Sequence, residues 1–171
     1  ASTFFQKSYY RYSNGAIMRD RNEQIDYMAG LVEKYGLFYV EDGLQEEDFS
    51  GFIELNGQSG KKSLIVGDDL TVTHFDRVDR AVRGGAINAM IIKPNQNGSL
   101  LEVARIVDLC KQRGIKMVFS HRSGETMDDA LADYAVGFGA DFIKCGIYGP
   151  ERMVKLRRVM EIEKKIYGFV K

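Results

Sequence analysis

The feature of this sequence that most constrains its fold is a pattern that repeats along the chain. A segment with helical spacing of apolar residues leads into a short apolar run, which ends in a glycine, an aspartate or a charged residue. The five apolar runs cover residues 37–40, 63–67, 87–92, 116–119 and 141–143. Helices that alternate with short strands are typical of βα units with right-handed crossovers. The sequence therefore predicts an α/β fold with parallel strands and about five βα units.

The apolar runs also indicate how these strands are covered. Residues 64–66 and 90–92 are apolar at consecutive positions, as expected for strands that are buried on both faces of a parallel sheet. The chain has 171 residues, which is the length of one ordinary domain. We predict a partial (β/α)₈ barrel of the TIM type. An open doubly wound sheet is the alternative, and it would spread the strand ends along one edge.

Capping residues predict several helix boundaries. Thr73 is expected to cap a helix that carries apolar residues at 75, 78 and 82, and Ser99 is expected to cap the following helix. A short helix is expected over 46–56, and a final amphipathic helix over about 151–167.

The first part of the chain does not follow the repeat. Residues 1–22 are polar and aromatic, with Asn14-Gly15 at their centre. An Asn-Gly pair between such segments is typical of a hairpin turn, so we expect a hairpin or an excursion loop here. Residues 23–171 are then expected to form the barrel portion.

The charge balance excludes two classes of partner. Lysine plus arginine and aspartate plus glutamate both number 24, so a dedicated nucleic-acid or anionic-membrane surface is not expected. No apolar run approaches the roughly 18 residues that cross a bilayer, and the N-terminus lacks the layout of a secretory signal. We expect a cytoplasmic protein. Cys110 and Cys145 lie 35 residues apart without metal-ligand spacing.

Five chemically active side chains follow the five apolar runs. They are Glu41, Asp68, Lys93, His121 and Lys144, and their separations are 27, 25, 28 and 23 residues. Because one βα unit spans each separation, we expect all five side chains at the same end of one sheet. In a barrel, active sites are built at this end.

This set of side chains suits the removal of a weakly acidic proton. Glu41 and Asp68, on neighbouring strands, offer the oxygen ligands that Mg²⁺ prefers. A lysine near such a cation is shifted toward its neutral form, which is a base. The cation would stabilise the enolate that forms when a proton next to a carboxylate is removed.

Each residue also has a simpler interpretation. Either carboxylate alone is more often a strand-end cap or an ion-pair partner of a lysine, and His121 alone is more often a hydrogen-bonded rim residue. The loop Ser120-His121-Arg122-Ser123-Gly124-Glu125-Thr126 is rich in donors and suits an anion such as phosphate. Its alternative is a capping loop, with Ser123 or Thr126 as the N-cap of the next helix.

Three motifs carry a resemblance to a known family. They are Val66-Gly67-Asp68-Asp69-Leu70-Thr71-Val72-Thr73, Lys93-Pro94-Asn95-Gln96-Asn97-Gly98-Ser99 and the loop that begins at Ser120. In order and spacing they resemble the C-terminal barrel of enolase, or phosphopyruvate hydratase. The resemblance implies a lyase of glycolysis and gluconeogenesis that interconverts 2-phosphoglycerate and phosphoenolpyruvate.

The resemblance also implies roles for the site residues. Glu41 and Asp68 match two of the family's three Mg²⁺ ligands, and Lys93 matches the base that takes the proton from C2 of 2-phosphoglycerate. Lys144 resembles the second lysine, which contacts the substrate carboxylate. Arg122 and Ser123 match phosphate-binding positions, and His121 matches the active-site histidine beside them.

The resemblance implies that the family's N-terminal domain, its first barrel strands and its third metal ligand precede the matching stretch, so we expect them to be absent from these residues. Five βα units cannot close an eight-stranded barrel, so we expect this stretch alone to be inactive or unstable. The open edges would be covered by the rest of an enolase, by a complementary chain, or by a second copy in a homo-oligomer. The alternative function is a noncatalytic, enolase-like binding or scaffold subunit.

Overall fold

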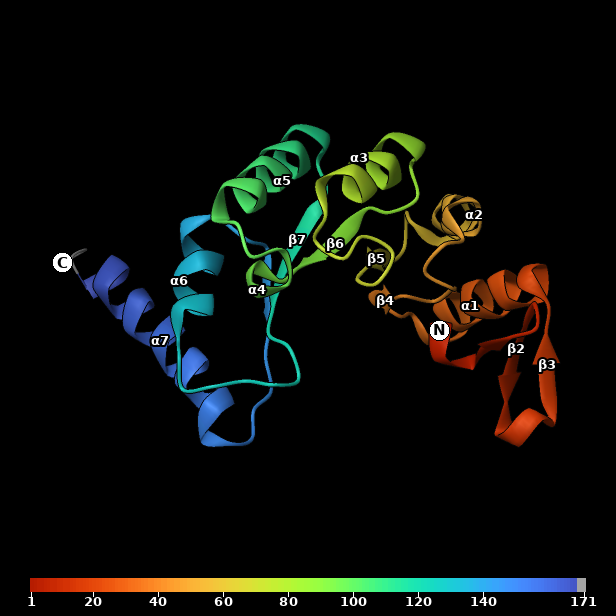
Figure 1. The fold of residues 1–171 in the computed structure, drawn as a ribbon, viewed down its shortest axis with the longest axis horizontal. Helices are drawn as coiled ribbons and strands as arrows, with labels where there is room; N and C mark the ends of the chain where they lie inside the picture. The colour runs from red at the N-terminus through yellow and green to blue at the C-terminus, as the bar shows by residue number, and fades with distance from the viewer. Residues whose placement is uncertain (169–171) are drawn as a thin grey trace.

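The computed structural model describes residues 1–168, and of Asn14 only the backbone. The last three residues of the predicted 23–171 segment lie outside the described part. The strands form two separate sheets, a three-stranded antiparallel sheet and a five-stranded parallel sheet (Figure 1). The strands are β1 (Phe5–Gln6), β2 (Tyr9–Tyr12), β3 (Ile17–Arg19), β4 (Tyr39–Glu41), β5 (Leu64–Gly67), β6 (Ala89–Ile92), β7 (Lys116–Ser120) and β8 (Phe142–Lys144). The α-helices are α1 (Arg21–Tyr35), α2 (Phe49–Ser59), α3 (Phe75–Gly84), α4 (Pro94–Asn97), α5 (Leu100–Arg113), α6 (Ala130–Gly137) and α7 (Pro150–Gly168).

The antiparallel sheet is built from the first residues of the chain. Strands β2 and β3 pair in antiparallel register from Tyr12 and Ile17 outward, and β1 pairs with the other edge of β2. A 3₁₀ turn over Ser13–Gly15 joins β2 to β3, so the connection across Asn14-Gly15 is that of a hairpin. This small sheet lies beside α1 at one end of the molecule (Figure 1).

The parallel sheet has the order β4-β5-β6-β7-β8, and each neighbouring pair is parallel. Helices α2, α3, α5 and α6 lie in the four crossovers between successive strands. Sequential parallel strands that are joined by helices are the arrangement of a barrel segment, whereas a doubly wound sheet reverses its strand order. The prediction of an α/β fold with a partial barrel of parallel strands is confirmed.

Local sequence explains where the helices begin and end. Helix α1 starts at a capping box in which Asp20 and Glu23 each accept from the other's backbone N–H, and it ends at Gly36 in the left-handed conformation, with φ of 61°. The predicted cap of α5 is confirmed, because the Ser99 side chain accepts from the Glu102 N–H. The prediction for α3 is wrong: His74 is the N-cap, and the Thr73 hydroxyl instead accepts from the Lys93 N–H at 2.9 Å.

The two faces of the parallel sheet are covered differently. Side chains that point outward, among them Ile65, Met90 and Phe119, join the main core beneath the helices. Side chains that point inward form a smaller cluster of Val66, Ala89, Ile91 and Val118, with Tyr39 and Leu64 packed against it. The alternation of strand side chains therefore divides the sheet into a helix-covered face and an inner face.

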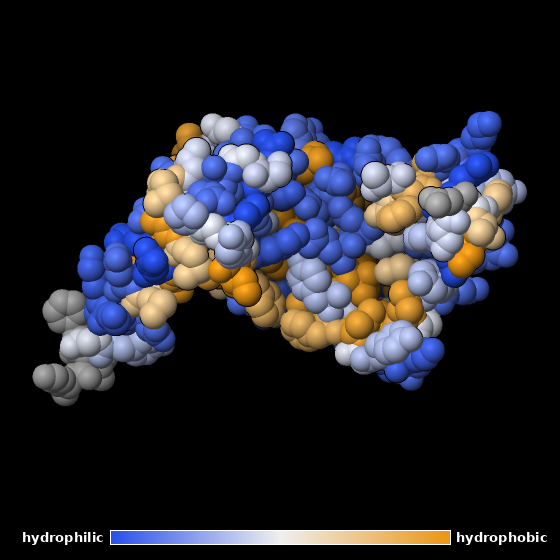
Figure 2. Space-filling model, turned by 90° about the horizontal axis from the view of Figure 1, so that it is seen from below, coloured by the Kyte–Doolittle hydropathy of each residue, from blue (hydrophilic) through white to orange (hydrophobic). Residues whose placement is uncertain are grey.

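The parallel sheet is curled, so its two edge strands approach each other across the inner face. The rings of Phe38, just before β4, and Phe142, in β8, pack edge to face with centroids 5.9 Å apart. Seen from below, apolar side chains gather near the middle of the molecular surface (Figure 2). The sheet is thus a half-barrel, and the four residues of its inner cluster are buried. In the part of the chain that the structure describes, no helix has the length and apolarity that crossing a membrane requires.

Candidate functional site

Strand register brings four of the predicted side chains to one end of the inner face. Glu41 is the last residue of β4 and pairs with Val66, whose side chain lies in the inner cluster. Asp68 lies two residues after Val66 and therefore has the same orientation. By the same alternation, Lys93 lies two residues after Ile91 of β6. Lys144, the last residue of β8, pairs with Ser120, two residues after Val118 of the inner cluster. All four lie at the carboxyl ends of parallel strands.

Asp68 and Lys93 form a close and largely buried ion pair. The Lys93 Nζ atom lies 2.6 Å from one carboxylate oxygen of Asp68 and 2.7 Å from the other. The side chain of Lys93 is only 14% exposed and that of Asp68 only 11%. Burial raises the pKa of Asp68, the bonds from Lys93 oppose this shift, and the charge of Glu41 adds to it, so the net shift is upward. The influence of Glu41 shows that the two predicted metal ligands share one electrostatic environment.

Glu41 has two side-chain partners. Both of its carboxylate oxygens lie 2.7 Å from the Lys144 Nζ atom, across the inner face from β4 to β8. The hydroxyl of Tyr39 donates to Glu41 Oε2 at 2.9 Å from two residues earlier on the same strand. Burial, together with the charge of Glu41 and this hydrogen bond, raises the pKa of Tyr39, which keeps its hydroxyl protonated.

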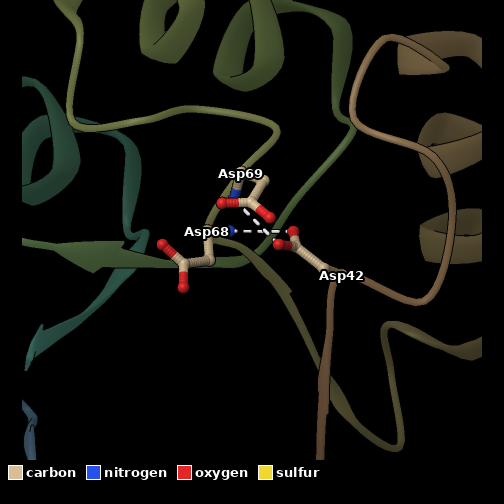
Figure 3. Close-up of side chains that lie close together, drawn as sticks. All are labelled: Asp42, Asp68 and Asp69. Atoms are coloured by element: carbon tan, nitrogen blue, oxygen red, sulfur yellow. Dashed lines mark hydrogen bonds between the residues drawn. The ribbon is translucent and has the colours of Figure 1, made fainter. Parts of the chain in front are cut away.

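A group of three aspartates lies beside the site. Oxygens of Asp42, Asp68 and Asp69 lie within 4.8 Å of one another, and Glu41 is outside this group. The Asp42 carboxylate accepts from the backbone N–H groups of Asp68 and Asp69 at 2.9 and 2.7 Å (Figure 3). The Asp68 carboxylate points away from Asp42, as Figure 3 shows. Asp42 therefore fixes the turn that carries Asp68.

Asp42 was missed by sequence reasoning, although it lies next to Glu41. Its backbone is left-handed, with φ of 45°, and this turns its side chain toward the end of β5. Burial raises the pKa of Asp42 to about 6, even though the two backbone N–H groups lower it. The only signal in the sequence is an aspartate between a strand end and Gly43, which is also common in ordinary turns.

The donor-rich loop lies at the end of β7, but it does not open a helix. Helix α6 begins at Ala130 with Asp129 as its N-cap, so the alternative of a capping loop, with Ser123 or Thr126 as the N-cap, is wrong. The amides of a helix N-terminus are therefore not part of this loop. Arg122 and Ser123 are exposed, and the Arg122 N–H donates to Glu125 Oε1 at 2.9 Å.

His121 lies at the rim between this loop and a cavity. Its Nδ1 atom is buried and has no hydrogen-bond partner among the described residues. Burial lowers the pKa of His121, with Glu125 opposing the shift, which keeps the imidazole neutral at neutral pH. The neighbouring cavity has a volume of about 320 Å³, and its polar lining includes Ser120, Glu125 and Lys155.

A buried ion pair connects this loop to helix α7. Lys155, in α7, lies 2.6 Å from Glu125, and the two side chains are 3% and 9% exposed. Lys155 also donates to the carbonyl oxygens of Thr126 and Glu151. The sequence does not predict this pair, because Lys155 has the same pattern as the exposed charged residues of an amphipathic helix. The pair ties the loop that carries His121 and Arg122 to α7.

The donor set of the site fits a hard divalent cation. Glu41 and Asp68 each present both carboxylate oxygens to an ammonium group, so each is already oriented to hold positive charge. Oxygen ligands of this kind are those that Mg²⁺ takes in proteins, with water or substrate oxygens in the remaining positions. Each of the two carboxylates has a lysine amino group beside it.

Comparison with known proteins agrees with this geometry. Residues 1–170 match the family model described as the enolase C-terminal TIM barrel domain. The enolase of Picrophilus torridus is 43% identical over 166 residues, which cover 97% of this chain and 41% of that protein. The enolase of Natronomonas pharaonis is 47% identical over 152 residues, 89% of this chain and 38% of that protein.

A third relative, the enolase of Archaeoglobus fulgidus, is 48% identical over 141 residues, which are 82% of this chain and 35% of that protein. The chain thus spans about two fifths of the length of the curated relatives that it matches. The half-barrel, the motifs at its strand ends and these identities lead to one conclusion: this chain belongs to the enolase family, whose C-terminal TIM barrel domain it matches over nearly its whole length.

Proposed function

We propose that this chain supplies part of the active site of an enolase, which interconverts 2-phosphoglycerate and phosphoenolpyruvate. The observation that carries the proposal is the pair of ion pairs on the inner face, Glu41 with Lys144 and Asp68 with Lys93. This observation supports the proposal because barrel enzymes build their active sites at the carboxyl ends of the parallel strands. Enolases are the relatives that this chain matches.

Each side chain has a distinct part in this proposal. Lys93 takes the proton from C2 of 2-phosphoglycerate, and the ammonium of Lys144 binds the substrate carboxylate. Arg122 and Ser123, which are exposed on the loop, bind the phosphate, with neutral His121 beside them. The hydroxyl at C3 leaves as water, with its proton supplied from outside this stretch.

Glu41 and Asp68 are the residues that would hold Mg²⁺. When bound there, Mg²⁺ would compensate the negative charge that Lys93 and Lys144 now neutralise and would stabilise charge on the substrate oxygens. This role fits the oxygen donors of the site and the short distances at which they already hold ammonium groups.

We further propose that the site is complete only with the part of an enolase that this chain does not match. By the complete assembly we mean this chain together with that part, whether joined to it or supplied as a second polypeptide. Residues of such a site act as a unit, so two ligands and a base without their partners should turn over substrate poorly.

The test is the absorbance of phosphoenolpyruvate formed from 2-phosphoglycerate, with and without Mg²⁺. The complete assembly is expected to be active only with Mg²⁺, and this chain alone is expected to be nearly inactive. An inactive complete assembly at saturating Mg²⁺ would refute the enzyme proposal and leave the noncatalytic scaffold. Equal activity of the chain alone would refute the claim that the site is incomplete.

A further inference from the structure

The contact between Tyr39 and Glu41 is not used by the reaction as proposed above. Both residues lie on β4, two positions apart, so their side chains point to the same inner face. The Tyr39 hydroxyl donates to Glu41 Oε2 at 2.9 Å, while its ring packs against the small cluster of Val66, Ala89, Ile91 and Val118. The phenol is thus anchored by packing at one end and by the carboxylate at the other.

The second partner of Glu41 has a different role in the proposed reaction. Lys144 now contacts both oxygens of Glu41, but its side chain is 43% exposed and is proposed to turn to the substrate carboxylate. When Lys144 does so, Tyr39 is the side-chain donor that still holds Glu41, among the contacts that the structure describes. Its bond engages Oε2 and leaves Oε1 free to meet a cation.

We propose that Tyr39 is a positioning residue for the metal site: its hydroxyl fixes the orientation of the Glu41 carboxylate as an Mg²⁺ ligand. This inference rests on the proposed function, in which Glu41 binds Mg²⁺. A hydrogen bond from a neighbouring side chain orients a ligating carboxylate and tunes its affinity, and loss of such a partner commonly weakens metal binding by about 10- to 100-fold. Tyr39 touches neither substrate nor metal in this proposal.

The experiment compares Mg²⁺ binding by calorimetry, without substrate, in the complete assembly and its variants. Tyr39→Phe keeps the ring and its packing and removes only the hydroxyl, so it should bind Mg²⁺ about 10-fold more weakly. The matched control is Tyr12→Phe, which removes a hydroxyl in the antiparallel sheet that donates to Gln24 Oε1 at 3.1 Å and does not bond to Glu41. The control should bind Mg²⁺ like the wild type.

Activity provides a second readout. In Tyr39→Phe the Mg²⁺ concentration that gives half-maximal rate should rise by the same factor, while kcat at saturating Mg²⁺ stays close to the wild-type value. Mg²⁺ affinity within twofold of the wild type in Tyr39→Phe, or equal weakening in the control, would overturn the inference. Glu41→Gln separates the two claims: if it binds Mg²⁺ like the wild type, the metal role of Glu41 fails and the proposed function fails with it.

Discussion

The Nζ atom of Lys144 lies 2.7 Å from both carboxylate oxygens of Glu41, although 103 residues separate them in sequence. The contact joins the first and last strands of the parallel sheet across its inner face. It exists because the sheet curls, and the packing of Phe38 on Phe142 closes the same gap at the other end of the strands. A flat sheet of five strands would hold these residues far apart.

This relationship predicts that stability and activity can be separated at Lys144. Lys144→Met should lower the free energy of unfolding by no more than about 1 kcal/mol, because the pair is partly exposed to solvent. The same variant should raise KM for 2-phosphoglycerate strongly in the complete assembly, since the substrate carboxylate would lose the partner that we propose for it. Urea unfolding and steady-state kinetics check the two parts. A loss of several kcal/mol with unchanged kinetics would show that Lys144 is structural only.

Loss of the buried ion pair between Glu125 and Lys155 should lower the stability of the fold strongly. Lys155→Met leaves the Glu125 carboxylate buried without its partner, which should cost about 3 to 5 kcal/mol of unfolding free energy. The matched control is Lys62→Met, which breaks an exposed pair with Glu33 and should cost less than about 1 kcal/mol. Denaturant unfolding of both variants measures the difference. Equal losses of unfolding free energy in the two variants would mean that burial does not raise the cost of breaking the pair of Glu125 and Lys155.

Acid should weaken the loop through Glu125. Burial raises the pKa of this carboxyl, but the bonds from Lys155 and from the Arg122 N–H outweigh it, so the folded-state pKa lies below the ordinary value of 4.5. A carboxyl with a lowered pKa stabilises the fold above its unfolded pKa, and this stability is lost as the pH falls through the folded pKa.

The unfolding free energy, measured from pH 6 down to pH 3, tests whether stability falls with pH as predicted. Both pH limits lie about 1.5 units from the ordinary pKa of glutamate. The wild type should lose more stability over this range than Glu125→Gln, which cannot titrate at this position. Parallel curves for the two proteins would remove Glu125 from the acid response.

Asn88 provides a prediction about the fold. Its side chain donates to the carbonyl oxygens of Gly60 and Ser63 at 2.9 and 3.0 Å and accepts from the Ile65 N–H at 2.7 Å. Asn88→Ala should therefore lower the unfolding free energy by about 2 to 4 kcal/mol, about 1 kcal/mol for each lost bond. Asn95→Ala, at an exposed position, should change it little. Thermal or urea unfolding checks both, and equal effects would contradict the role of Asn88.

The sequence predicts most elements of this fold because they depend on local spacing. Apolar runs give the five parallel strands, and Ser99 caps its helix through a contact with a residue only three positions away. Threonine is preferred over histidine as an N-cap residue. The Thr73 hydroxyl nevertheless accepts from the backbone N–H of Lys93, 20 residues further on, and His74 is the N-cap. Propensity carries no information about such a distant partner.

In the candidate site, too, the sequence predicts the local features but not the long-range contacts. Glu41, Asp68, Lys93 and Lys144 are spaced one or two βα units apart in sequence. This spacing predicts that they lie at the same end of the sheet, and they do. Which lysine meets which carboxylate depends on the curl of the sheet, and the pairing of Glu125 with Lys155 depends on how α7 packs against α6. Contacts of this kind are set by tertiary structure and leave no local signal in the sequence.

The central claim is that Lys93 removes the proton from C2 of 2-phosphoglycerate. Exchange of the C2 hydrogen with solvent deuterium, followed by NMR in the complete assembly with Mg²⁺, measures this step separately from loss of the hydroxyl. The wild type should exchange this hydrogen, and so should Lys116→Ala, which alters a lysine paired with Asp141 at the opposite end of the sheet. Lys93→Ala should show no exchange while remaining folded. Exchange by folded Lys93→Ala at close to the wild-type rate would contradict the account.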